Sequence, residues 1–209
     1  MATAKLLLGI ICLAFIGRSA VPDRDLLRQQ TDQILMIAAR QLSVREATGG
    51  NDGKQVEAYL NYVGFKKGDP WCAAFVSWVF KEAGYDQPKT AWSPDLFPAR
   101  YCVKKVIPGL VLGIYFKELG RIGHCGIVTA TRHNWVESIE GNTNVMGSRE
   151  GDGVYRKLRH VKTISKFAEW RRTLSLRGAG EKHESPGLMK SACLTYLNNR
   201  KEARDVTVH

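Results

Sequence analysis

The sequence predicts an α+β fold in which N-terminal helices pack on a C-terminal antiparallel β-sheet. In residues 25–84, apolar side chains recur at helical spacing, whereas beyond residue 108 short runs of β-forming residues alternate with turn residues. The composition is 44% hydrophobic and 24% charged, which is typical of a globular protein. We therefore expect residues 21–172 to form one domain with a core of its own.

Three helices are expected in the first half of the chain. The first covers residues 25–42, and the second follows Asp52, a candidate N-cap. Asp69 can cap the third helix, with Pro70 at its first helical position. Because this third helix is apolar nearly all the way round, it is expected to lie buried at the centre of the domain.

Strands are expected after a connection that contains proline and tryptophan, residues 87–108. Each is short, rich in β-forming residues and bounded by turn residues. The expected strands are residues 110–116, 123–131, 135–140, 153–159 and 164–171.

The two ends of the chain differ from the rest. Residues 1–20 contain Lys5, an apolar run over 6–16 and small residues, which is the pattern of a secretory signal peptide. The run is shorter than the roughly 20 residues that span a bilayer, so contact with a membrane is expected only through this signal. A buried N-terminal helix or an uncleaved anchor is the alternative. Residues 173–209 are polar and are expected to form a weakly ordered tail, with a short helix possible within it.

The chain is basic, with a formal net charge of +11. Such a surface attracts polyanions, although a solvated basic surface without a specific partner explains the charge equally well. The basic residues are scattered and form no motif interleaved with aromatic residues. We therefore expect no nucleic acid as a partner.

The cysteines indicate neither a metal site nor a disulfide framework. Their spacing is irregular and lacks the close Cys/His pairs of zinc sites, so no metal, cofactor or disulfide is predicted. The cysteines are Cys12, Cys72, Cys102, Cys125 and Cys193.

Cys72 is a candidate nucleophile because it falls near the third position of the expected buried helix. The helix dipole and the free N–H groups of a first turn stabilise a thiolate. The same N–H groups can bind the oxyanion that forms when sulfur attacks a carbonyl group. The alternative is that Cys72 is a small buried apolar residue.

His124 is the candidate base, although a histidine in a strand is often only structural. Gly123 and Gly126 flank it and leave space for a neighbouring group. A turn centred on His133 would place Asn142 opposite His124 and Glu140 on the diagonal, all on one face of the sheet. An oxygen of either residue could then bind Nδ1 and leave Nε2 facing the sulfur. A turn one residue different would reverse the faces.

Three ordered segments, residues 70–78, 123–128 and 136–144, resemble the CHAP family of cysteine, histidine-dependent amidohydrolases and peptidases. The similarity extends over residues 46–170. It implies a papain-like fold without a cofactor. It further implies the roles of the site residues: Cys72 as nucleophile, His124 as base, and Glu140 and Asn142 as orienting and polarising groups. Cys125 stands where the family has an aliphatic residue, and we expect its side chain to point away from His124 with little consequence.

The resemblance and the signal together imply an exported protein, in the periplasm, cell envelope or medium, that cleaves amide bonds of peptidoglycan. The expected partner is a peptidoglycan peptide or glycopeptide, and the expected state is a monomer. The bond could be the amide between muramic acid and L-alanine, or one in the stem or cross-bridge. The alternatives are an inactive wall-binding domain of the same fold, a secreted effector or toxin amidase, or an amidase for a small thiol conjugate.

Overall fold

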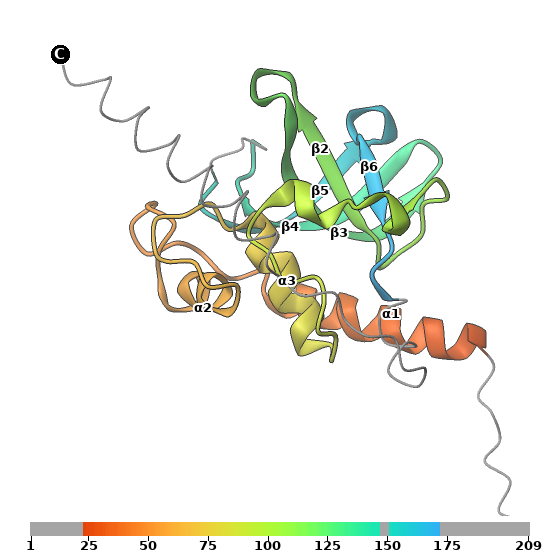
Figure 1. Ribbon diagram of the computed structural model, residues 1–209, viewed down its shortest axis with the longest axis horizontal. Coiled ribbons are helices and arrows are strands. Elements are labelled where there is room, and N and C mark those ends of the chain that lie inside the picture. Colours follow the sequence, from red (N-terminus) through yellow and green to blue (C-terminus); the bar gives the residue numbers. More distant parts are fainter. Residues whose placement is uncertain (1–22, 147–150, 172–209) are drawn as a thin grey trace, which may run out of the picture.

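The computed structural model describes residues 23–146 and 151–171 (Figure 1). The helices precede the main strands in the sequence, as the hydrophobic pattern predicts, so the α+β class is confirmed. The helices are α1 (Asp23–Arg40), α2 (Lys54–Tyr62) and α3 (Cys72–Glu82), followed by the 3₁₀ helices η1 (Ser93–Leu96), η2 (Ala99–Tyr101), η3 (Lys117–Leu119) and η4 (Val161–Thr163).

Six strands of the described residues form one antiparallel sheet with the order β1-β6-β2-β3-β4-β5. Five of them correspond to the expected strands, and the short β1 lies in the connection that the sequence left without structure. The strands are β1 (Cys102–Val103), β2 (Val111–Phe116), β3 (Arg121–Arg132), β4 (Trp135–Thr143), β5 (Gly153–His160) and β6 (Lys166–Ala168).

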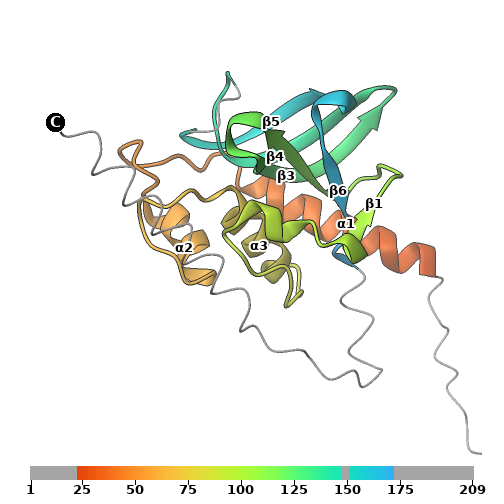
Figure 2. The ribbon, with the colours of Figure 1, turned by 45° about the horizontal axis from the view of Figure 1, so that its top comes forward.

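The three α-helices lie on one side of the sheet (Figure 2). Helix α3 is central and its side chains are almost all buried, in agreement with its apolar sequence. It approaches β4 closely at Gly141, where a Cβ atom would lie 2.7 Å from Trp71 and 2.8 Å from Phe75. The absence of a side chain at Gly141 therefore brings the start of α3 against the sheet. A second apolar cluster, which includes Leu112 and Val136, is separate from the core around α3.

Two expected helix caps are wrong. Trp71, not Asp69, precedes the first residue of α3, and Asp69 instead accepts a hydrogen bond from the backbone N–H of Lys66 at 3.2 Å. Gly53 precedes α2, and Asp52 accepts hydrogen bonds from Thr48. In both cases the aspartate stabilises the turn before the helix. Cys72 consequently occupies the first position of α3 and not the third.

The hairpin between β3 and β4 contains a turn and a bulge whose effects compensate. Arg132 pairs with Trp135, so the turn consists of two residues and is not centred on His133. That pairing is shifted by one residue from the expected register. A bulge between Val128 and Ala130 shifts the pairing back, so the expected register holds beyond it. Beyond the bulge Ile127 pairs with Ile139, as the sequence argument requires.

The expected signal peptide, residues 1–20, and the expected tail, residues 173–209, lie outside the described residues. Within residues 23–146 and 151–171, none of the helices combines the length and the apolar character that crossing a bilayer requires.

Candidate active site

The candidate nucleophile lies at the junction of α3 with the sheet. Cys72 is a free thiol, it begins α3, and 5% of its surface is exposed. Its Sγ atom is 3.3 Å from the hydroxyl oxygen of Ser93, the first residue of η1. Because the first N–H groups of a helix have no partner within it, this position supplies backbone donors and a favourable dipole.

His124 and Glu140 contact each other directly in the interior. His124 Nε2 is 2.8 Å from Glu140 Oε2, and both residues are almost completely buried. His124 Nδ1 has no hydrogen-bond partner of normal geometry in the described structure. The imidazole nevertheless lies close enough to Cys72 for the cysteine to raise its pKa. Nδ1 is therefore the nitrogen left for the sulfur, and the expected roles of the two ring nitrogens are reversed.

Gly126 makes the contact between His124 and Glu140 possible. A Cβ atom at residue 126 would lie 2.4 Å from Cγ of Glu140, so the glutamate side chain crosses the strand where no side chain stands. The expectation that a glycine beside His124 clears space is thus confirmed for Gly126. At Gly123 the space is filled by Phe116 and Leu119.

Glu140 is held by two further residues that the sequence reasoning missed. Arg159 donates through Nε to Oε1 and through Nη2 to Oε2, both at 2.6 Å, and Ser138 Oγ donates to Oε1 at 2.6 Å. Alternation along β4 places Ser138 on the face of Glu140, so that residue could have been found from the sequence. Arg159 could not, because its role depends on the pairing of β5 with β4.

The site forms a chain of alternating charges. Burial alone would raise the pKa of Glu140, but Arg159, followed by His124, lowers it to about 2. Burial would likewise lower the pKa of His124, yet the hydrogen bonds to Cys72 and Glu140 raise it to about 9. At neutral pH the imidazole is therefore protonated between two anions.

The Cys72 thiol has a pKa well below its ordinary value. A hydrogen bond from Cys125 is the largest cause, and it acts with His124 and Ser93 against the effect of burial. Burial and the neighbouring Cys72 raise the pKa of the Cys125 thiol well above its usual range, so Cys125 stays protonated and donates. The expectation that Cys125 has little consequence is wrong, because Cys125 acts on the candidate nucleophile.

The amide of Asn142 hydrogen-bonds to residues other than His124. With its amide oriented to satisfy its donors and acceptors, Oδ1 accepts from the N–H of Trp71 at 3.0 Å. Its Nδ2 donates to the Gly151 carbonyl at 3.1 Å and to Asn51 Oδ1 at 3.2 Å. Of the two residues expected to orient the imidazole, only Glu140 is placed to do so, while Asn142 holds the backbone next to Cys72.

Glu46, a residue of the resemblance, supports the same segment from the other side. Its Oε1 accepts from the Trp71 indole N–H and its Oε2 from the Asn51 backbone N–H, both at 2.8 Å. Trp71 is thus fixed through its backbone by Asn142 and through its side chain by Glu46. The position of Cys72, the next residue, depends on both.

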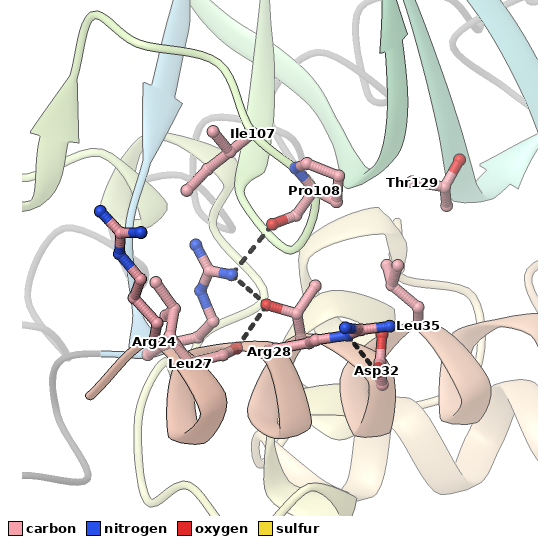
Figure 3. A pocket seen from close by; sticks show the side chains of 10 residues that line it. Arg24, Leu27, Arg28, Asp32, Leu35, Ile107, Pro108 and Thr129 are labelled. Carbon is pink, nitrogen blue, oxygen red and sulfur yellow. Dashed lines mark hydrogen bonds and ion pairs between the residues drawn. The ribbon is translucent and has the colours of Figure 1, made fainter. Parts of the chain in front are cut away.

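No group of three or more His, Cys, Asp or Glu side chains in the described ranges is arranged to hold a metal ion. A cavity is present between α1 and the segment before β2 (Figure 3). It includes Arg24, Leu27 and Pro108 but none of Cys72, His124, Glu140 or Asn142. This cavity is separate from the candidate active site.

The comparisons with known proteins do not establish a family. No family model matches the sequence, and no curated protein matches it. Among solved structures, the crystal structure of a protein called Ly7917 is similar with a TM-score of 0.39 and 13% identity. The similarity covers 66% of this chain and 60% of the Ly7917 chain.

Proposed function

We propose that the protein is an exported cysteine hydrolase of papain-like fold that cleaves amide bonds of peptidoglycan. The observation that carries the proposal is the buried series Cys72, His124, Glu140, in which the imidazole lies between a thiol of lowered pKa and an ionised carboxylate. A residue that served only for packing would not require a protonated histidine and a bidentate arginine behind it. The three segments that resemble the CHAP family support the reaction class and the substrate.

The reaction begins from the thiolate and imidazolium pair. The Cys72 sulfur attacks the amide carbonyl carbon, and N–H groups of the first turn of α3 bind the oxyanion. When the C–N bond breaks, Nδ1 of His124 gives its proton to the leaving amine. The neutral imidazole then takes a proton from water, which attacks the thioester and releases the acid and the Cys72 thiolate.

Glu140 supports both states of His124. Its carboxylate accepts from Nε2, which fixes the ring orientation and stabilises the positive charge. The formal net charge of +11 suits a substrate whose peptides carry free carboxylates. The sequence resemblance and these charges favour a cell-wall peptide over a small thiol conjugate.

The test is to incubate the purified full chain with peptidoglycan and to identify released peptides and new amino termini by mass spectrometry. We expect soluble fragments from the wild type, whose ends identify the bond, and none from Cys72→Ala. Cys102→Ala is the matched control, since it removes another free thiol that is not part of the site.

Two results would contradict the proposal. Equal release by Cys72→Ala would exclude Cys72 as the nucleophile. Binding of the wild-type protein to peptidoglycan without any cleavage would favour the wall-binding alternative.

A further inference from the structure

Cys72 and Cys125 are two free thiols in contact at the candidate active site. The two thiols lie close enough to shift each other's pKa, and Ser93, whose hydroxyl oxygen is 3.3 Å from Cys72 Sγ, acts on both of them. Both cysteines belong to the core cluster between α3 and the sheet, and Cys125 is 0% exposed. In the proposed hydrolysis Cys125 acts only on the pKa of Cys72, so its own sulfur forms no bond to the substrate.

We propose that Cys72 and Cys125 form a redox pair in which a peroxide oxidises Cys72 and Cys125 then closes a disulfide with it. The disulfide would block the nucleophile reversibly and protect it from irreversible oxidation. The effect on hydrolysis rests on the proposed function, whereas formation of the disulfide does not.

The residue types favour oxidation over metal binding. Cys72, Cys125 and His124 lie close together, but they do not form a group that could hold a metal ion. A thiolate with little exposure is reached by a small oxidant such as hydrogen peroxide more readily than by a protein disulfide. Susceptibility to oxidation follows thiolate character, and Cys72 is the thiol of this pair that is ionised.

The steps balance with one peroxide molecule. The Cys72 thiolate attacks one peroxide oxygen, the O–O bond breaks, and the hydroxide takes the proton of the His124 imidazolium and leaves as water, which gives a sulfenic acid. The Cys125 sulfur then attacks the Cys72 sulfur, the S–O bond breaks, and a second water leaves with the Cys125 proton. Two thiols are oxidised to one disulfide and the peroxide is reduced to two waters.

The first step removes the obstacle to the second. The Cys72 thiolate contributes to the raised pKa of Cys125, and this contribution ends when the sulfur becomes a neutral sulfenic acid. The thiolate also raises the pKa of His124, so the imidazole releases its proton more readily after oxidation and can accept one from Cys125. The resolving thiol is thereby activated only after the nucleophile has reacted.

The test treats the full wild-type chain with two equivalents of hydrogen peroxide, enough for sulfinic acid to form if no disulfide closes, alkylates the remaining thiols with iodoacetamide, and maps the peptides by mass spectrometry. We expect a linked peptide that joins Cys72 to Cys125 and is lighter by two hydrogen atoms than the two peptides together. After reduction with dithiothreitol, iodoacetamide should alkylate both thiols. In Cys125→Ser, Cys72 should instead gain two oxygen atoms and should no longer be recovered.

Cys102→Ser is the matched control. It should still form the linked peptide, and dithiothreitol should still restore both thiols. Because peptide mapping of the wild type needs no variant, the test remains valid if Cys125→Ser fails to fold. Oxidation of wild-type Cys72 to sulfinic acid while Cys125 stays alkylated would overturn the redox pair, as would a disulfide from Cys72 to Cys102 or Cys193. A Cys72–Cys125 disulfide that leaves peptidoglycan cleavage unchanged would overturn the proposed function and leave the redox pair in place.

Discussion

Arg159 and Glu140 form a bidentate ion pair in which both nitrogen–oxygen distances are 2.6 Å. The Glu140 side chain is fully buried, whereas 16% of the Arg159 side chain is exposed. Breaking a buried pair by removal of one partner leaves an uncompensated charge in the interior. The pair therefore links the stability of the sheet to the charge state of the candidate active site.

We expect Arg159→Met to lower the free energy of unfolding by about 3 kcal/mol, the lower end for a broken buried pair. The pKa of Glu140 should rise, because Arg159 is the main group that lowers it. Urea unfolding followed by circular dichroism measures the first effect.

Arg156→Met is the matched control, since Arg156 is an exposed residue on the same strand and its loss should change stability by less than about 0.5 kcal/mol. Arg159→Lys should lie between the wild type and Arg159→Met, because lysine keeps the charge but not the bidentate geometry. Equal stability of Arg159→Met and Arg156→Met would show that the ion pair does not hold Glu140.

At alkaline pH, both the cleavage rate and the stability should follow the titration of His124. Its pKa is raised from 6.5 to about 9, so the stabilising proton is fully bound below pH 6.5 and is lost as the pH rises through about 9. The leaving amine requires that proton, and we expect cleavage of peptidoglycan to decline near pH 9. Initial rates and unfolding free energies measured over the same pH range separate loss of the proton from loss of the fold.

His124→Gln should abolish the step in stability near pH 9, because the titrating group is gone. A cleavage rate that still increased above pH 9 would exclude the imidazolium as the proton donor for the leaving amine.

Gly126→Ala tests the path of the Glu140 side chain across β3. The new Cβ atom would lie 2.4 Å from Cγ and 3.3 Å from Cβ of Glu140, so the carboxylate must move away from His124. We expect a loss of stability of about 1–3 kcal/mol, typical of overpacking, together with a lower pKa of His124. The histidine pKa is measured by NMR titration.

Gly50→Ala is a suitable control, because the nearest atom to its new Cβ, Thr48 Oγ1, is 3.3 Å away. If Gly126→Ala kept the His124 pKa of the wild type, the contact between His124 and Glu140 would not depend on the space at residue 126.

The sequence predicted the α-helices, five of the strands and the candidate series of Cys72, His124 and Glu140, because each depends on local patterns. Helical spacing identified α3, and alternation placed His124 and Glu140 on one face. The register was predicted correctly for a wrong reason: the turn has two residues, and the bulge near Thr129 shifts the pairing back. A bulge of this kind leaves no clear pattern in the sequence.

The parts that the sequence could not predict depend on contacts between distant segments. Arg159 lies 19 residues from Glu140 and reaches it only because β5 pairs with β4. Cys125 acts on Cys72 across the boundary between the sheet and α3, as does its neighbour His124. The orientation of the imidazole could not be predicted either, because it depends on where the start of α3 places Cys72 relative to the ring.

Asn142 offers a test of the backbone before Cys72 that is separate from the ion pairs. Its φ is 55°, in the left-handed region that glycine adopts without strain, so Asn142→Gly keeps the backbone and removes only the side chain. The lost hydrogen bond to Trp71 should cost about 0.5–1.5 kcal/mol and loosen the start of α3. We expect slower alkylation of Cys72 by iodoacetamide, because its thiolate would be held less firmly at the helix.

Asn142→Asp is the informative partner, since its carboxylate can still accept from the Trp71 N–H but adds a negative charge near the thiolate. We expect this variant to be less stable than Asn142→Gly, because its buried carboxylate would face the Gly151 carbonyl and Asn51 Oδ1, and to raise the pKa of Cys72, measured as the pH dependence of alkylation. If iodoacetamide alkylated Cys72 in both variants at the wild-type rate at every pH, Asn142 would not control the position of Cys72. The geometry of the nucleophile would then depend on Glu46 and its bond to the Trp71 indole.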